Sequence, residues 1–323
     1  MIFDYRKNLK PYEYPELTLY RDAIRHSYWL VDEFPITADI QDYYLVSSVH
    51  KSALTKAILA IAQVEVSVKT FWGDLYSHIP KPEIGEVGYT FAESEVRHSQ
   101  AYSELLEKLG LNREFEKIHE IPALNDRVYY LTKALKGSKS RSEREYALSL
   151  LLFSIFIENV SLFSQFLILM SFSKYTNRFR GVNNIIQATS KEESLHGLFG
   201  MALINIIKDE YPEWFDEDMY DRIKKACLKA YKAENKVLDW IFEEGELEFL
   251  PRQAIDNFIK DRYNKSLRSV GVDPLFEVDN DTLVDLKWFD EEAIATPHSD
   301  FFGERPTAYS KFQQAITEDD LFD

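Results

Sequence analysis

The stretch "FAESEVRHSQAY", residues 91–102, decides the fold of this chain. It places Glu95, His98 and Tyr102 at intervals of three and four residues inside an otherwise apolar run. On an α-helix these intervals bring all three side chains to one face. A buried carboxylate is stable only beside a cation or a strong hydrogen-bond donor, so the pair Glu95 and His98 indicates a ligand site in a helical core.

The same motif recurs about a hundred residues later as Glu193-Ser-Leu-His196, and each motif follows an apolar helix with a lone glutamate. These glutamates are Glu65 in "IAQVEVSVK" and Glu158 in "FSIFIENVSLF". The intervals from Glu65 to Glu95 and from Glu158 to Glu193 suit two long antiparallel helices joined by a turn. One Glu from each of two helices, with Glu-x-x-His from each of two others, is typical of ferritin-like di-metal carboxylate proteins.

Other interpretations of these residues remain open. A third motif, Glu116 and His119, lies just ahead of Pro122 among charged neighbours, and we interpret it as a solvated face. The remaining Glu and His residues could bond to one another in the core without a metal. Tyr102 could be an ordinary buried tyrosine. If metal binds, carboxylate oxygens with one imidazole per ion favour iron or manganese.

The whole sequence predicts an all-α protein. It has 323 residues, 45% of them hydrophobic, and only 11 Gly and 11 Pro. We expect one long helix or two abutting helices over about 39–80, and single helices over 83–110, 142–174 and 181–211, with more in 212–270. A ferritin-like domain would then cover residues 1–299, followed by a flexible, acidic tail over 300–323.

Charge and cysteine content exclude several classes of function. The formal net charge of −16 argues against nucleic acid and anionic membrane surfaces as partners. The apolar run over 147–172 contains Glu158, Asn159 and Gln165, so we interpret it as a buried helix and not a membrane span. A single cysteine and an N-terminus without an apolar core favour the cytoplasm.

The strings "ESEVRHSQAY", "IENVSLFSQF" and "KEESLHGLFG" resemble the radical-generating small (β) subunit of class I ribonucleotide reductase over essentially the whole chain. The resemblance implies a ferritin-like homodimer with two metal ions. Its six ligand positions fall on Glu65, Glu95, His98, Glu158, Glu193 and His196.

The resemblance also implies an electron route. The radical tyrosine position falls on Tyr102, and an electron-transfer tryptophan, joined to a ligand histidine through an acidic residue, falls on Trp29 and Glu192. The C-terminal tail would dock on the large catalytic subunit and carry Tyr309. Ribonucleotide reduction needs several thiols, and this chain has one, so it would be the radical-supplying partner.

Two departures from the common family pattern bear on the metal. Glu65 stands where the first ligand is usually Asp, and Glu192 stands where the common form has Asp. A glutamate at the first position resembles two minority groups, one with Phe at the tyrosine position and a manganese/iron centre, and one with a dimanganese centre that stores the oxidising equivalent on the metals. Tyr102 does not match the Phe of the first group. Mn₂ is therefore favoured, and Fe₂ or Mn/Fe is possible. The ordinary tyrosyl-radical form stays open. If these segments are regular helices, Gln165 and Thr189 lie near the phenol of Tyr102 and make its pocket polar.

Three proteins of other classes would share part of this pattern. A ligand-binding di-metal oxidase would have the six ligands but no use for a tyrosine-bearing acidic tail. A ferritin-type iron store would assemble a hollow shell. A helical interaction protein would hold no stoichiometric metal.

Overall fold

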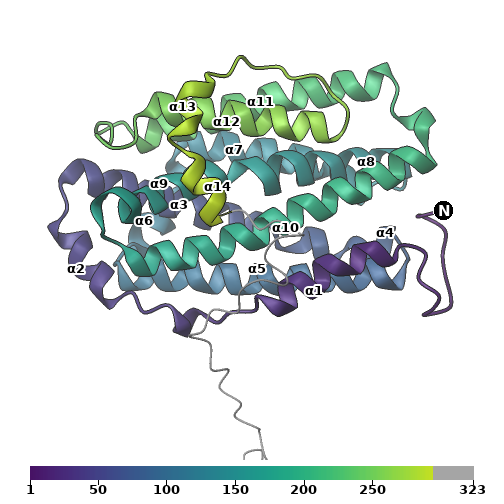
Figure 1. Ribbon diagram of the computed structural model, residues 1–323, viewed down its shortest axis with the longest axis horizontal. Helices are drawn as coiled ribbons and strands as arrows, with labels where there is room; N and C mark the ends of the chain where they lie inside the picture. The colour runs from purple at the N-terminus through teal and green to yellow at the C-terminus, as the bar shows by residue number, and fades with distance from the viewer. Residues whose placement is uncertain (294–323) are drawn as a thin grey trace, which may run out of the picture.

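Two long helix pairs form the centre of the molecule. The computed structural model describes residues 1–293, apart from the side chains of residues 67–69. Helix α3 (Ser48–Gly73) packs against α5 (Pro82–Lys108), and the segment η5 (Phe153–Ser161) packs against α10 (Arg180–Glu210). Figure 1 shows α5 and α10 running along the long axis of the molecule, with α1 beside them. No strand occurs in residues 1–293, which confirms the all-α prediction.

The α-helices are α1 (Thr18–His26), α2 (Thr37–Leu45), α3 (Ser48–Gly73), α4 (Leu75–His78), α5 (Pro82–Lys108), α6 (Asn112–Glu116), α7 (Pro122–Ala134), α8 (Glu143–Leu152), α9 (Phe163–Thr176), α10 (Arg180–Glu210), α11 (Glu217–Ile241), α12 (Arg252–Ser269), α13 (Asn280–Val284) and α14 (Lys287–Ala293). Short 3₁₀ turns are η1 (Pro15–Leu17), η2 (Val31–Glu33), η3 (Ile118–Glu120), η4 (Leu135–Lys139) and η6 (Pro212–Trp214), and η5 (Phe153–Ser161) is a π-helix.

The predicted helix boundaries are confirmed where the sequence carries a start or stop signal. Helix α5 begins at Pro82, whose missing N–H is unneeded in the first turn. It is followed by Gly110, which has a φ of +72°, a conformation that glycine adopts without strain. The stretch expected as one or two helices over 39–80 is three helices. The break falls at Ser47, whose hydroxyl accepts the backbone N–H of His50 and begins α3.

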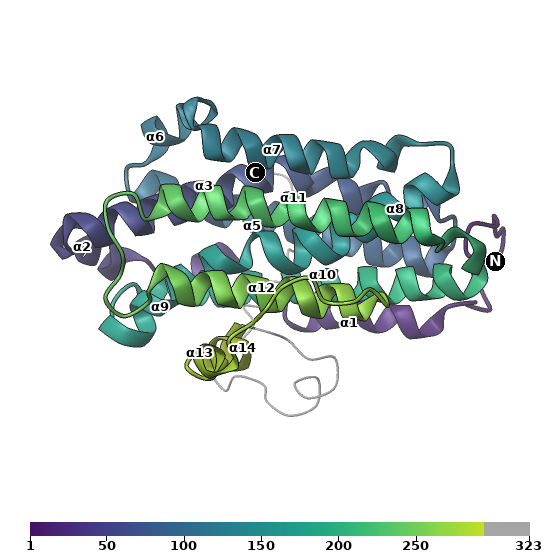
Figure 2. The same ribbon diagram turned by 90° about the horizontal axis from the view of Figure 1, so that it is seen from above.

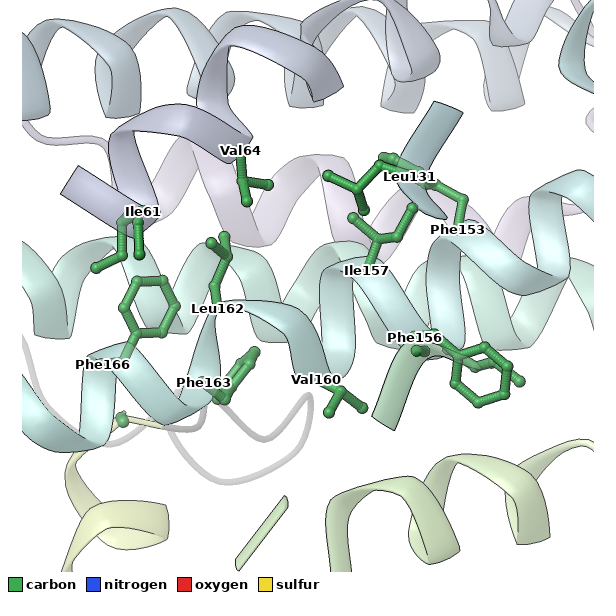
Figure 3. Close-up of a cluster of buried hydrophobic side chains, with 14 of the residues drawn as sticks. Ile61, Val64, Leu131, Phe153, Phe156, Ile157, Val160, Leu162, Phe163 and Phe166 are labelled. Carbon is green, nitrogen blue, oxygen red and sulfur yellow. The ribbon is translucent and has the colours of Figure 1, made fainter. Parts of the chain in front are cut away.

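The apolar segment Glu143–Thr176 is one continuous helical stretch with a π-helical centre. It is long and apolar enough to cross a membrane, yet 94% of its apolar 18-residue stretch is buried within the protein. Figure 3 shows Phe153, Phe156, Ile157 and Phe163 from this stretch packed in a hydrophobic cluster, which also receives Ile61 and Val64 from α3. The structure agrees with the predicted core helix.

A second group of buried polar residues lies between α7 and α11, which pack against each other (Figure 2). The Arg127 guanidinium lies 3.7 Å from a carboxylate oxygen of Glu234, and both side chains are almost completely buried. Arg127 also donates to the Gln165 amide oxygen at 3.3 Å and to the Ala60 carbonyl. Burial raises the pKa of Glu234 to about 7, although the charge of Arg127 opposes the shift.

This raised pKa predicts that stability depends on pH. The folded protein retains the Glu234 proton up to about pH 7, whereas the unfolded chain releases it near 4.5. The stabilising contribution is therefore complete below pH 4.5 and is lost as the pH rises through 7. Relative to Glu234→Gln, we expect the wild-type free energy of unfolding to fall by about 3 kcal/mol between about pH 4.5 and 8.

Urea unfolding of both proteins at the two pH values, with a chelator present, measures this difference. The matched control is Glu244→Gln, because Glu244 is an exposed glutamate. If the difference between wild type and Glu234→Gln does not change with pH, the assignment of a raised pKa is wrong.

Candidate metal centre

Six buried side chains converge between the two helix pairs. They form two groups whose nitrogen and oxygen atoms lie within 4.8 Å of one another, and each group contains Glu95 and Glu193. The first group is completed by Glu65 and His98, and the second by Glu158 and His196. The residues come from α3, α5, η5 and α10, so each helix contributes as the sequence predicted. The structure brings all six predicted ligand residues together.

Both imidazoles turn the same nitrogen towards the carboxylates. His98 Nδ1 lies 3.0 Å from Glu193 Oε1 and 3.7 Å from Glu95 Oε2. His196 Nδ1 lies 3.2 Å from Glu95 Oε1, 3.3 Å from Glu193 Oε2 and 3.5 Å from Glu158 Oε2. Glu95 and Glu193 therefore each face both histidines. This is the position of residues that could bridge two ions.

The opposite nitrogen of each imidazole has a hydrogen-bond partner outside the centre. His98 Nε2 lies 2.8 Å from Glu192 Oε2, and His196 Nε2 lies 2.9 Å from the Ser94 hydroxyl oxygen. Partners of this kind fix the ring orientation and the tautomer of a metal-binding histidine. The Nδ1 atoms are thus held towards the centre.

The donor set fits a pair of cations. Within residues 1–293, both carboxylate oxygens of Glu95, Glu193 Oε2 and the two Nδ1 atoms have no polar contact outside the six residues themselves. Buried polar atoms are rarely left in this state, and four glutamates in one interior repel one another strongly. An oxygen-rich set with one imidazole in each group suits manganese or iron.

The close packing of the four glutamates also changes the pKa values of the histidines and of Glu158. Burial lowers the pKa of His98 and of His196, but the surrounding carboxylates more than reverse this and raise each pKa well above its usual value. Burial and the charge of Glu193 raise the pKa of Glu158. The metal-free histidines thus hold protons, so metal binding must displace them and must weaken at low pH.

Trp72 is a neighbour of the centre: the sequence placed it on the inner face of its helix but did not predict its contact with Glu158. Its indole N–H donates to Glu158 Oε1 at 2.9 Å, and the ring is completely buried. Trp72 follows Glu65 by seven residues, two helical turns, so both lie on one face of α3. This spacing could have indicated the contact.

The resemblance implied that Glu192 joins Trp29 to His98, and the structure shows one of these two links. Its ring is nearly parallel to that of His98, at 14°, with 6.1 Å between centroids. Glu192 binds His98 as expected. However, Trp29 Nε1 forms no hydrogen bond within residues 1–293. Glu192 is instead held by Arg97, whose Nη2 and Nη1 lie 2.9 and 3.2 Å from its two oxygens.

Arg97 is therefore a residue that the sequence analysis missed. It is 3% exposed, and its guanidinium lies 5.3 Å from the centre of the Trp29 ring and 4.5 Å from that of Tyr28. The signal was present in "ESEVRHSQAY", where Arg97 directly precedes the predicted ligand His98 on one helix. In this structure Glu192 is held by Arg97 and His98, and the expected bond from Trp29 is absent.

Tyr102 lies one helical turn beyond His98, as predicted, and is 1% exposed. Its hydroxyl forms no hydrogen bond within residues 1–293. Burial, followed by the charge of Glu65, raises its pKa well above the usual value, and the Thr189 hydroxyl opposes this shift. The expectation of a polar pocket holds for Thr189 only, because the Gln165 amide is bonded to Arg127 and Ser164.

The remaining predicted residues lie elsewhere. Glu116 and His119 are exposed on α6 and η3, which confirms the interpretation of that motif as a solvated face. Tyr309 and the expected tail over 300–323 lie outside the described residues.

The helical fold and the paired groups of buried carboxylates and histidines define a ferritin-like protein with a site of the di-metal carboxylate type. More particularly, the chain belongs to the ribonucleotide reductase small chain family, whose model matches residues 6–282. This family comprises oxidoreductase subunits that work with a large catalytic subunit.

Individual relatives agree with this assignment. A probable ribonucleoside-diphosphate reductase small subunit of Invertebrate iridescent virus 3 is 26% identical, over 95% of this chain and 85% of its own. The dimanganese(II)-NrdF structure of Streptococcus sanguinis matches with a TM-score of 0.70 and 17% identity, over 87% and 96% of the chains. An R2-like ligand-binding oxidase variant with a Mn/Fe cofactor matches with a TM-score of 0.69 and 16% sequence identity, over 80% of this chain and 94% of its own. At these identities the structural matches support the fold alone.

Proposed function

We propose that this chain is the subunit that supplies an oxidising equivalent for ribonucleoside diphosphate reduction, and that its centre holds two metal ions. The observation that carries the proposal is the pair of ligand groups that share Glu95 and Glu193. When bound, the metal pair supplies the one-electron oxidant. The ligands are the six predicted residues, Glu65, Glu95, His98, Glu158, Glu193 and His196.

Manganese is our preferred metal, with Fe₂ and Mn/Fe as alternatives. Glu65 at the first ligand position supports this choice, and the similar Streptococcus sanguinis protein is described as dimanganese(II). The surroundings of Tyr102 support it as well. A tyrosine must release its phenolic proton to become a neutral radical, and within residues 1–293 no carboxylate or imidazole accepts a hydrogen bond from the Tyr102 hydroxyl. The oxidant would then reside on the metals, with Tyr102 as a bystander.

The residues around the centre have separate tasks in this proposal. Glu192 holds His98 in the ligand orientation, and Arg97 holds Glu192. Trp29, stacked beside His98, relays one electron inward from the protein surface. Tyr309 takes that electron from a cysteine of the large subunit, so the cysteine is oxidised to a thiyl radical.

The tail and the assembly complete the proposal. Residues 1–299 form the metal-binding domain of a homodimer, and residues 300–323 dock on the large subunit. The acidic end "EDDLFD" supports docking on a basic surface. A cytoplasmic location without nucleic-acid or membrane partners accords with the net charge of −16 and the single, buried cysteine.

Metal analysis with electron paramagnetic resonance tests where the oxidant resides. We expect protein loaded with manganese and then exposed to oxygen or superoxide to show a manganese multiline signal. This signal should decay when the large subunit and substrate are added, and Tyr102→Phe should behave in the same way. If iron-loaded protein instead shows an organic-radical signal that Tyr102→Phe removes, Tyr102 is the store and the dimanganese assignment is wrong.

A ligand-binding di-metal oxidase is the second candidate, because a structure of that kind shares the fold at a TM-score of 0.69. Such a protein should not bind a ribonucleotide reductase large subunit, and deletion of residues 304–323 should not affect it. A subunit of the reductase should bind the large subunit and lose that binding on deletion. Size-exclusion mass distinguishes a dimer from a ferritin-type shell, and metal retention after dialysis excludes a metal-free interaction protein.

A further inference from the structure

A basic groove lies on the surface between α7 and α11, over a different pair of helices from those that carry the six ligands. Its volume is about 460 Å³. Asp126 is the single acidic residue in its lining, whereas six basic side chains line it, namely Lys133 from α7 and Arg222, Lys225, Lys229, Lys232 and Lys236 from α11. The α11 residues follow one another at intervals of three and four, so they share one face of the helix.

Most of these cations have no counter-charge. Arg222 binds Glu145 through two hydrogen bonds of 2.8 and 2.7 Å, and Lys236 pairs with Asp126. The other four, Lys133, Lys225, Lys229 and Lys232, form no ion pair with any residue in the described part of the chain. A smaller adjoining hollow, which shares Lys133 and Arg222 with the groove, adds Lys136, and that lysine is also without an ion pair in residues 1–293.

This arrangement is unfavourable for the isolated chain. Like charges three and four residues apart on a helix repel each other and reduce its stability. The protein has 54 acidic residues against 38 basic ones, so carboxylates for pairing are plentiful elsewhere. Clustered, unpaired lysines in a protein of net charge −16 reverse the local field and attract an anion.

The remaining lining of the groove indicates the size and character of the anion. Ala134, Leu152, Ala226 and Ala233 supply an apolar surface. Tyr129 is 63% exposed at the rim, and the Lys133 ammonium lies 4.8 Å from the centre of its ring. An exposed aromatic ring beside lysines suits a base stacked next to phosphates. The volume lies within the usual range of small-molecule sites.

We propose that this groove binds an organic polyphosphate with the size and charge of a nucleoside triphosphate. Lys225, Lys229 and Lys232 would contact the phosphates, and Tyr129 the base. A compact ligand meets only the local positive field, whereas an extended nucleic acid would also meet the negative remainder of the surface. The proposal is independent of the metal centre.

Calorimetric titration of the full-length, metal-free protein with ATP tests the site, with divalent cations omitted so that ATP carries none to the centre. The test variant is Lys229→Gln/Lys232→Gln, and its folding is checked by circular dichroism. It removes repulsion, so it should be at least as stable as the wild type. The matched control is Lys117→Gln/Lys287→Gln, which removes two exposed lysines from α14 and from the segment after α6.

We expect one ATP site per chain. The affinity for ATP should fall at least about tenfold in the test variant and should also fall at higher salt, but it should not change in the control variant. Tyr129→Leu should weaken ATP binding but not the binding of inorganic tripolyphosphate. No binding at millimolar ATP, or equal binding by the test variant, would overturn the proposal. If tripolyphosphate binds as tightly as ATP, the groove recognises the phosphates only, and the proposed contact between Tyr129 and the base is wrong. Tighter binding of hexaglutamate or an oligonucleotide would assign the groove to a macromolecule.

Discussion

Glu193→Ala is expected to leave the protein folded but with less than about one metal ion per chain, against about two in the wild type. Glu193 belongs to both ligand groups, and its two oxygens lie 3.0 Å from His98 Nδ1 and 3.3 Å from His196 Nδ1. Its loss therefore weakens both ion positions at once. Ribonucleotide reduction should fall to background, because no other group within residues 1–293 can replace the oxidant.

Metal content after loading and gel filtration measures the first effect, and an assay with the large subunit measures the second. The matched control is Glu116→Ala, which alters the exposed Glu-x-x-His motif and should change neither. Thermal unfolding of the metal-free proteins adds a third comparison. Because the Glu193 carboxylate faces two protonated imidazoles in the metal-free protein, its loss should lower metal-free stability at neutral pH, whereas Glu116→Ala should not. Retention of two ions by Glu193→Ala would show that the six residues are not the ligand set.

Trp29→Phe is expected to keep both metal ions and to lose ribonucleotide reduction by at least about a thousandfold, equivalent to about 4 kcal/mol in the activation barrier. Phenylalanine preserves the stacking on His98, at 6.1 Å between centroids, but is far harder to oxidise than an indole. The loss should therefore appear in the reduction rate and not in metal content. Tyr309→Phe should give the same result.

Trp288→Phe is the matched control for this loss. Trp288 is also largely buried, at 9% exposure, but it lies on α14 and its N–H binds Tyr175. Its replacement should leave reduction almost unchanged. Nearly full activity in Trp29→Phe would rule out Trp29 as the relay and would leave its place beside Arg97 as packing only.

The cluster of six buried carboxylate and imidazole side chains could be predicted from the sequence because it depends on local periodicity. Glu95 and His98 share a face in any α-helix, and so do Glu193 and His196. Tyr102 was located by the same rule. Gly110 and Pro82 likewise mark helix ends through their own backbone preferences.

The rest depends on contacts between helices, which periodicity does not report. Arg97 was invisible as a partner of Glu192 because the two lie ninety-five residues apart. Gln165 was assigned to the phenol pocket by counting along an α-helix, but the preceding segment η5 is a π-helix. A π-helix holds more residues per turn than an α-helix, so the side chains that follow η5 are rotated away from the α-helical count. Gln165 consequently meets Arg127.

The lysine face of α11 has a consequence for the way the molecule moves. A body of net charge −16 with basic side chains clustered on one face has an uneven charge distribution and therefore an electric dipole moment. A charged partner therefore exerts a torque on it as well as a force, and rotates it during approach. This alignment acts over about 10 Å at 0.1 M salt and about 30 Å at 0.01 M. Encounters in dilute buffer will thus be pre-oriented, whereas those in concentrated salt will begin from random orientations.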